Sequence, residues 1–259
     1  MRSRLPVVLT IAGFDPSGGA GIVADVRTIV QLGCRPAAAI TSLTFQNSAG
    51  VFGSIHESAK SLRAQVTLIV AEMDVAAVKI GMLPTAELVS EVVGLVQEGR
   101  LPAPVLDPVM KSSSDYELME HDALVVLKRD LLPLVRLITP NIVETATLTG
   151  VEILDEVGMR QAADDLRQLG ARAVLIKGGH LQQESGAKAE AVDVLDEDGA
   201  VTVFRGIWID AAPVRGTGCM LSSAIAAGLA KGQPLLESVA AAKQFVAAEI
   251  QNSTLKTQN

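Results

Sequence analysis

Short apolar segments recur along the chain and alternate with segments that have the periodicity of a helix. Residues 159–169 show the clearest helical stripe, with apolar side chains at i, i+3, i+4 and i+7 counted from Met159, and Gly170 follows as the expected helix end. Strands that alternate with helices indicate parallel βαβ units. The apolar runs of strand length cover residues 6–13, 36–44, 76–81, 103–107, 135–140 and 172–179.

The strand-like runs are almost continuously apolar, which indicates that helices cover both faces of the sheet. Residues 190–208 differ, because two strand-like runs flank the turn sequence "DEDG" and predict a β-hairpin at an antiparallel edge. Residues 216–250 predict two helices rich in Ala and Leu. We therefore expect a three-layer α/β/α sandwich with a mostly parallel sheet. Residues 1–259 form a single domain in this interpretation, since no linker or repeat interrupts them.

Composition narrows the classes of function. The chain has a formal net charge of -7 and only 3% aromatic residues, which argues against a nucleic-acid surface and favours small-molecule partners. Cys34 and Cys219 form no metal or disulfide spacing, so a reducing cytoplasm is expected. No apolar run approaches the roughly 18 residues of a membrane span, and the N-terminal segment reads as the first strand rather than a signal peptide.

A glycine-rich loop, "GFDPSGGAG", covers residues 13–21 and lies between the first strand and an amphipathic segment. Residues 19–24 match the dinucleotide fingerprint GxGxxA, but the second strand ends without the carboxylate that would bind a ribose, and Asp15 would repel a pyrophosphate. A purely structural turn is the alternative. Asp25 has a similarly simple explanation, a favourable interaction with the positive end of a helix.

A second glycine loop begins a long helix of small residues at 215–230. Gly216, Thr217 and Gly218 place several backbone N–H groups at the start of this helix, which is typical of a phosphate site. Cys219 lies in the first turn, where the helix dipole can lower the pKa of a thiol, although a buried small hydrophobe is the alternative. The chain contains no GxxxxGK[ST] motif, so it is not a P-loop NTPase.

Polar residues also follow several predicted strands. Asp107 ends one strand, Asn141 and Glu144 share a helical face after the next, and Lys177 follows a third, where an ammonium can meet a nucleotide phosphate. Oxygen ligands of this kind suit a hydrated magnesium ion. Each residue also has a capping or surface explanation. The three histidines, His56, His121 and His180, show no metal spacing.

Seven motifs in a fixed order resemble the ribokinase superfamily, and specifically its hydroxymethylpyrimidine and phosphomethylpyrimidine kinases of thiamine biosynthesis. They are "TIAGFDPSGGAGIVAD", "AITSLTFQNSAGV", "VKIGML", "VLDPVM", "LITPNIVETATLTG", "VLIKGGH" and "RGTGCMLSSAIAAGLA". The resemblance spans nearly the whole chain. It implies a ribokinase-like fold, ATP and Mg²⁺ as cofactors, a pyrimidine substrate and a homodimer.

The resemblance also implies roles for individual residues. The first glycine loop binds the alcohol substrate, and Asp25 hydrogen-bonds the amino group and ring of the pyrimidine. The glycine turn 216–218 is the anion hole for the transferring phosphoryl group, and Cys219 stands where sugar kinases carry an aspartate base. The implied pyrimidine pocket is lined by Gly13, Thr44, Gln46, Met82 and Val109. The implied ATP and magnesium site contains Asp107, Asn141, Glu144, Lys177 and Thr217.

The chain departs from the family pattern at Phe14, Val23 and Arg215, the last of which stands where a histidine is usual, and its C-terminus lacks the family's glycine-rich segment. These departures concern substrate choice more than reaction type. A pyridoxal kinase is therefore one alternative, because pyridoxal is also a flat ring with a hydroxymethyl group. A non-catalytic sensor of pyrimidine or vitamin is the other.

Overall fold

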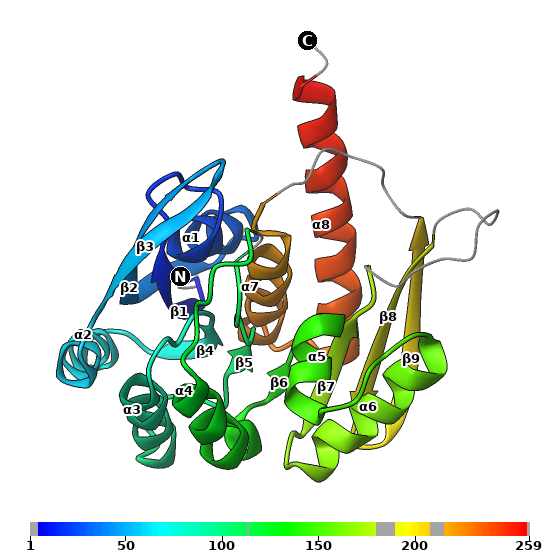
Figure 1. Cartoon of the computed structure of the whole chain (residues 1–259). Coiled ribbons are helices and arrows are strands. Elements are labelled where there is room, and N and C mark those ends of the chain that lie inside the picture. The colour runs from blue at the N-terminus through cyan, green and yellow to red at the C-terminus, as the bar shows by residue number, and fades with distance from the viewer. Residues whose placement is uncertain (1–4, 113, 180–189, 208–214, 258–259) are drawn as a thin grey trace.

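The structure is a computed structural model that describes residues 5–112, 114–179, 190–207 and 215–257. Within these residues, nine strands form one sheet with helices on both sides (Figure 1). The strands are β1 (Val7–Phe14), β2 (Arg35–Asn47), β3 (Gly50–His56), β4 (Val75–Ile80), β5 (Val105–Leu106), β6 (Leu137–Ile138), β7 (Ala173–Lys177), β8 (Glu190–Glu197) and β9 (Ala200–Ile207). The expected positions of His180 and of the hairpin's last residue, Trp208, lie outside the described residues.

The strand order is β3-β2-β1-β4-β5-β6-β7-β8-β9, and the six strands from β2 to β7 in this order pair in parallel. The mostly parallel sheet and the antiparallel hairpin β8–β9 are confirmed. The hairpin turns at Asp198 and Gly199, which both have positive φ as a two-residue turn of this kind requires. The sequence did not reveal β3, which pairs antiparallel with β2 and forms a second antiparallel edge.

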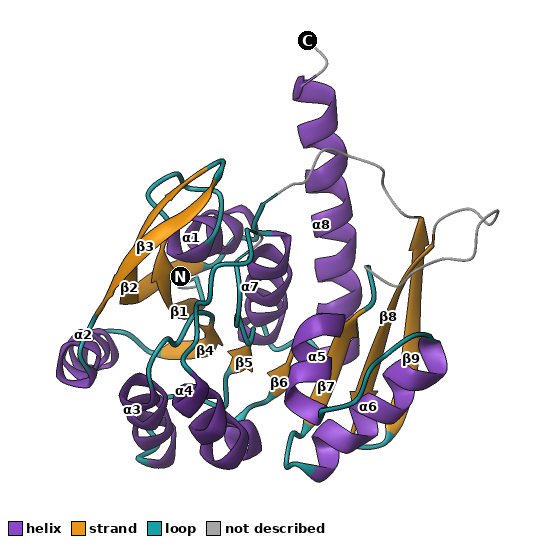
Figure 2. Cartoon of the chain, in the orientation of Figure 1, coloured by secondary structure: helices purple, strands orange, loops and turns teal. Residues whose placement is uncertain are grey.

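Helices cover both faces of the sheet, which confirms the three-layer sandwich (Figure 2). Helices α1, α7 and α8 pack on one face, and α2 to α6 pack on the other. The helices are α1 (Gly21–Gln31), α2 (Ala59–Glu72), α3 (Ala86–Gln97), α4 (His121–Val126), α5 (Ile142–Thr149), α6 (Glu156–Gln168), α7 (Thr217–Ala230) and α8 (Leu235–Thr257). A short π-helix and a 3-10 turn, at Leu127–Leu131 and Leu132–Leu134, follow α4.

The continuous apolar pattern of the strands follows from this double covering. In β1, Leu9 and Ile11 belong to the core beneath α2 to α6, whereas Val8 belongs to the core beneath α1, α7 and α8. Successive side chains of a strand point to opposite faces, so both sets of side chains of a central strand are covered, and the first seven residues of β1 are all buried. None of the helices in the described part of the chain is both long enough and apolar enough to cross a bilayer.

Two central strands are shorter than their apolar runs. β5 and β6 have two residues each, and a proline follows closely after both, at Pro108 and Pro140. Proline has no N–H to donate to a neighbouring strand, so the ladder ends there and the chain leaves the sheet. Asp107 directly follows β5 and Asn141 follows β6 after Thr139 and Pro140, so both lie beyond adjacent parallel strands on the same edge of the sheet.

Candidate active site

The predicted site residues gather at the carboxyl edge of the parallel strands, which is where ligands bind in open α/β sheets. The loops after β1, β4, β5, β6 and β7 leave the sheet there, and α7 begins beside them (Figure 2).

The glycine turn 216–218 opens α7 with backbone groups alone. Gly216 is the N-terminal cap with φ of 77°, and no side chain caps the helix. A Cβ on Gly218 would lie 3.3 Å from Lys177 Nζ and 3.5 Å from Asp107 Oδ2. Uncapped N–H groups of a helix start beside an ammonium form an anion site, so Lys177 and the turn are placed to bind the same phosphate.

Asp107, Lys177 and Glu144 form one charge cluster. Lys177 Nζ lies 2.9 Å from Asp107 Oδ1, and the side chain of Asp107 is only 3% exposed. Burial alone would lower the pKa of Lys177, but Asp107 and Glu144 outweigh it and raise that pKa, so the ammonium stays charged. The structure thus brings together three residues, one just after β5, one at the end of β7 and one in α5, that the sequence singled out separately.

Asn141 and Glu144 form a reciprocal capping box at the start of α5. The Asn141 side-chain oxygen accepts from the Glu144 N–H at 2.8 Å, and the Asn141 N–H donates to Glu144 Oε2 at 2.8 Å. The capping role that the sequence suggested as an alternative for these residues is therefore present in the structure. The capping box uses one carboxylate oxygen of Glu144, and Glu144 still belongs to the charge cluster with Asp107 and Lys177.

Glu144 carries an unusual protonation equilibrium for a carboxyl group. Burial, with a further contribution from Asp107, raises its pKa to about 7 against the opposing effects of Lys177 and two backbone hydrogen bonds. A buried pair of carboxylates with one ammonium between them has an affinity for additional positive charge. In the described residues no three or more His, Cys, Asp or Glu side chains are arranged to hold a metal by themselves. Magnesium characteristically uses one or two carboxylates, waters and substrate phosphates, and Asp107 with Glu144 fits that donor set.

Cys219 lies in the first turn of α7 and is partly exposed. Burial raises the pKa of its thiol to about 11, while Lys79 and a backbone hydrogen bond from Gly21 act in the opposite direction. The expectation that the helix start would lower this pKa is wrong, because desolvation of a thiolate costs more than these interactions return. Cys219 is a neutral thiol near pH 7.

Asp25 is fully buried in a polar network between α1, β1, β4 and α7. Lys79 Nζ lies 2.8 Å from Asp25 Oδ2, Thr10 donates to the same oxygen at 2.6 Å, and Ser223 donates to Oδ1 at 2.8 Å. The interpretation of Asp25 as a partner of the helix dipole is wrong, because α1 begins at Gly21 and has no acidic residue in its first turn. Contact with a pyrimidine stays a prediction, and the structure gives both carboxylate oxygens protein partners.

Lys79 is the polar residue of this region that sequence reasoning missed. Its side chain is 0% exposed, and a Cβ on Gly81 would lie 2.7 Å from its Nζ, so the glycine makes room for the ammonium. Burial favours a lower pKa, but Asp25, Cys219 and Asp107 together raise the pKa of Lys79. The available signal was a single charged residue inside the apolar run 76–81.

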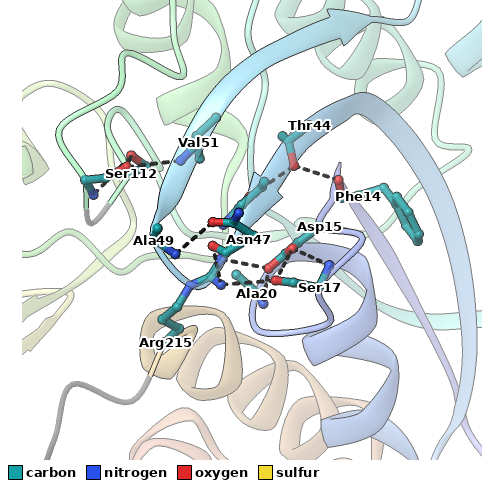
Figure 3. A network of polar contacts seen from close by, with 12 residues as sticks. Phe14, Asp15, Ser17, Ala20, Thr44, Asn47, Ala49, Val51, Ser112 and Arg215 are labelled. Atoms are coloured by element: carbon teal, nitrogen blue, oxygen red, sulfur yellow. Dashed lines mark hydrogen bonds and ion pairs between the residues drawn. The ribbon is translucent and has the colours of Figure 1, made fainter.

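The predicted acceptor residues lie around the ends of β1, β2 and β4. A Cβ on Gly13 would come 2.9 Å from Met82 Sδ, so these two residues are adjacent. Thr44 Oγ1 lies 2.9 Å from the Phe14 carbonyl oxygen and 3.0 Å from Gln46 Oε1 (Figure 3). Val109 is half-buried two residues after Asp107, whose carbonyl accepts its N–H. Gly13 therefore lies next to Met82, and Thr44 next to Gln46. Val109 lies in the loop that follows β5 and contains Asp107.

A family model described as phosphomethylpyrimidine kinase matches residues 15–259. The chain belongs to this family. A curated hydroxymethylpyrimidine/phosphomethylpyrimidine kinase of Streptomyces coelicolor is 42% identical over 245 residues, covering 95% of this chain and 88% of the relative.

Solved structures agree with this membership of the phosphomethylpyrimidine kinase family. A crystal structure of phosphomethylpyrimidine kinase from Clostridium difficile has a TM-score of 0.82 and 36% identity, covering 94% of this chain and 99% of the other. An ADP complex of Bacillus subtilis pyridoxal kinase has a TM-score of 0.84 and 34% identity, covering 94% and 91%. The ribokinase-like fold expected from the seven motifs is confirmed.

Proposed function

We propose that this member of the phosphomethylpyrimidine kinase family transfers the terminal phosphoryl group of ATP to hydroxymethylpyrimidine, and then to the monophosphate to give the diphosphate. The observation that carries the proposal is the meeting of the uncapped glycine turn 216–218 with Lys177 and Asp107. Phosphoryl transfer through a loose transition state needs positioning and charge neutralisation more than covalent help, and these groups supply both.

Each part of the site has a role in this proposal. The N–H groups of Gly216, Thr217 and Gly218 bind the phosphoryl oxygens, and Lys177 compensates their charge. Asn141 belongs to the ATP side through the capping box that orients Glu144. A magnesium ion held by Asp107 and Glu144 would supply further neutralisation of the phosphates when bound.

The acceptor side is proposed to bind the flat ring between Gly13 and Met82 on one side and Thr44 and Gln46 on another. Because the Cys219 thiol is neutral near pH 7, it presents no fixed negative charge to an anionic acceptor. The alcohol must lose its proton as the new bond to phosphorus forms, and the thiolate form of Cys219, a small fraction of the protein near pH 7, is the proposed base that takes this proton and becomes the neutral thiol. The monophosphate needs no such step, since its oxygen is already anionic.

Pyridoxal phosphorylation is the second candidate, favoured by the structural similarity to the Bacillus subtilis pyridoxal kinase. Parallel assays of purified protein with ATP, magnesium and one of hydroxymethylpyrimidine, its monophosphate or pyridoxal distinguish the two. Turnover of both pyrimidines well above that of pyridoxal supports the proposal, and the reverse order contradicts it. Binding of a pyrimidine without turnover of any acceptor would instead identify a sensor.

We further propose that the chain forms a homodimer and that residues 1–259 fold as one unit. The outer face of the β2–β3 ribbon supports the first, because Leu43 and Ile55 pair across the strands beside Phe45 and all three are exposed. Contiguous exposed apolar side chains are typical of protein interfaces. Sedimentation measures the oligomeric state, and we expect a dimer for the wild type and a monomer for Phe45→Ser. A single cooperative unfolding transition is expected if residues 1–259 fold as one unit.

A further inference from the structure

Arg215 directly precedes the glycine turn 216–218 and contacts two other segments of the site (Figure 3). Its Nη1 donates to Ser17 Oγ at 3.0 Å and to the Asn47 carbonyl oxygen at 2.9 Å, and its Nη2 donates to Asp15 Oδ2 at 3.0 Å. One guanidinium therefore joins the loop after β1, the end of β2 and the start of α7.

Asp15 organises the loop at residues 15–20 from inside. Its side chain is 3% exposed and accepts from the Ser17 N–H at 2.8 Å, from Ser17 Oγ at 2.7 Å and from the Ala20 N–H at 3.0 Å. The ion pair with Arg215 is thus attached to the residue that determines the shape of this loop. A displacement of Arg215 would be transmitted to the loop as a whole.

The same loop touches both halves of the proposed site. A Cβ on Gly216 would lie 2.2 Å from the Gly19 carbonyl oxygen, and a Cβ on Gly21 would lie 2.2 Å from the Gly13 carbonyl oxygen. Gly21 also gives Cys219 its backbone hydrogen bond. Side chains are excluded at these approaches, so small movements of the loop change the spacing between the acceptor side and the glycine turn 216–218.

The chemistry of arginine suits this three-way contact better than the histidine that is usual here in the family. A guanidinium carries five donors in a rigid planar fork and stays charged at every physiological pH. An imidazole has two ring nitrogens on a shorter side chain and is mostly neutral near pH 7. The ion pair with Asp15 and the simultaneous bond to the Asn47 carbonyl are therefore features of this chain's own residue.

We infer that Arg215 is a positioning residue that fixes loop 15–20 and the end of β2 against the glycine turn 216–218, and thereby controls acceptor binding and alignment rather than ATP binding. The inference rests on the proposed function. Gln46, the residue before Asn47, and Gly13, which Gly21 contacts, both belong to the predicted pyrimidine pocket. The ATP cluster of Lys177, Asp107 and Glu144 has no hydrogen bond to Arg215 among the described residues.

The test compares Arg215→Met, Arg215→Lys and Arg215→His with wild type and with Arg63→Met. Arg63 is the matched control, because it forms an ion pair with Glu98 on α2 and α3 away from the site. The measurements are kcat, the KM of acceptor and of ATP, the acceptor Kd by calorimetry, and the melting temperature. We expect Arg215→Met to raise the acceptor KM about tenfold or more and to lower kcat, with the KM of ATP changed less than about twofold.

The other variants separate positioning from simple structural support. Arg215→Lys keeps the ion pair but loses the fork, so it recovers part of the acceptor affinity, and Arg215→His recovers less. Asp15→Asn resembles Arg215→Met, and the double variant is no worse than either single one because both act through one contact. Arg63→Met leaves both KM values unchanged.

Two kinds of result would overturn the inference, and they are distinguishable from each other. Equal rises in the KM of ATP and of acceptor, or a lower melting temperature with unchanged kinetics, would reduce Arg215 to a structural residue while leaving the proposed function intact. Failure of the wild type itself to bind or phosphorylate either pyrimidine would remove the proposed function, and the inference with it.

Discussion

Two aspartate–cation pairs involve the first helix of the site, one through Asp25 within α1 and one through Asp15 in the loop before it, and they differ mainly in their burial. The side chains of Asp25 and Lys79 are both 0% exposed, whereas that of Arg215 is 21% exposed and that of its partner Asp15 is 3% exposed. The N–O distances are similar, 2.8 and 3.0 Å. Although the two distances are similar, removing one partner should cost more free energy in the buried pair, because an unpaired charge is far less favourable in the interior than where water reaches it.

The two pairs also restrain different things. Asp25–Lys79 joins α1 to β4 inside the core, between elements that are already packed by apolar side chains. Asp15–Arg215 joins loops whose position otherwise depends on backbone contacts between glycines. We expect the buried pair, Asp25–Lys79, to affect mainly the free energy of unfolding. We expect the partly exposed pair, Asp15–Arg215, which we call the rim pair, to affect mainly the kcat and the acceptor KM.

Replacing Lys79 should have the largest effect on stability. Lys79→Met leaves Asp25 as an uncompensated buried charge, which costs about 3–5 kcal/mol of the free energy of unfolding. Guanidinium denaturation measures this loss. The double variant Asp25→Asn/Lys79→Met carries no unpaired charge and should recover most of it, whereas an equally unstable double variant would contradict the charge explanation.

Removing the charge of Glu144 should change how stability depends on pH. The Glu144 carboxyl has a pKa of about 7 in the folded protein against an ordinary value of 4.5, so the folded state binds more protons in that window and wild-type stability falls as the pH rises through it. Glu144→Gln should abolish this fall, which amounts to roughly 3 kcal/mol at most. Denaturation in EDTA from pH 4.5 to 8 measures it. A parallel pH dependence in both proteins would remove Glu144 as its source.

The alkylation rate of Cys219 measures how the charges of Asp25 and Lys79 affect its thiol. With a thiol pKa of about 11, alkylation by iodoacetamide should accelerate about tenfold per pH unit between pH 8 and 10, or roughly a hundredfold in all. Cys219→Ala identifies the background from Cys34, the other cysteine of the chain. The double variant Asp25→Asn/Lys79→Met should react more slowly at each pH if Lys79 stabilises the thiolate, and a rate plateau below pH 9 would contradict the raised pKa.

The rim pair should contribute the smallest change in stability. Arg215→Met removes the three hydrogen bonds that the partly exposed guanidinium donates, but it leaves Asp15 with three donors from Ser17 and Ala20, so we expect a loss of about 1–2 kcal/mol. Thermal and guanidinium unfolding measure it beside the kinetic assays above. A loss as large as that of Lys79→Met would erase the distinction between the two pairs.

Several site residues could be identified from the sequence because they follow strands. Asp107, Asn141 and Lys177 each come directly after or at the end of an apolar run, and parallel strands necessarily bring such positions to one edge. The strand β3 could not be found in this way. Its sequence, "GVFGSIH", has two glycines and exposed apolar side chains, and its pairing depends on the neighbouring β2.

The charge states of the site residues and their hydrogen-bond partners could be identified only from the folded structure. The position of Cys219 at a helix start suggested a lowered pKa, but the surrounding protein desolvates the thiol and raises it. The sequence placed Asp25 in the candidate pyrimidine pocket, and only the fold showed its protein partners Lys79, Thr10 and Ser223. A local motif determines the backbone geometry of a site, whereas the electrostatic environment of its side chains depends on residues that are distant in the chain.

The sequence by itself determined the α/β/α class, the edge of the sheet that carries the site and the resemblance to a kinase family, because hydrophobic periodicity, the alternation of strands with helices and the ordered motifs can all be identified along the chain. The tertiary structure alone decided that Lys79 compensates Asp25 and that Arg215 joins Asp15 to the Asn47 carbonyl. Hydrogen bonds and ion pairs depend on separations of a few ångströms between side chains. Such separations are set only when the helices and loops have packed against the sheet.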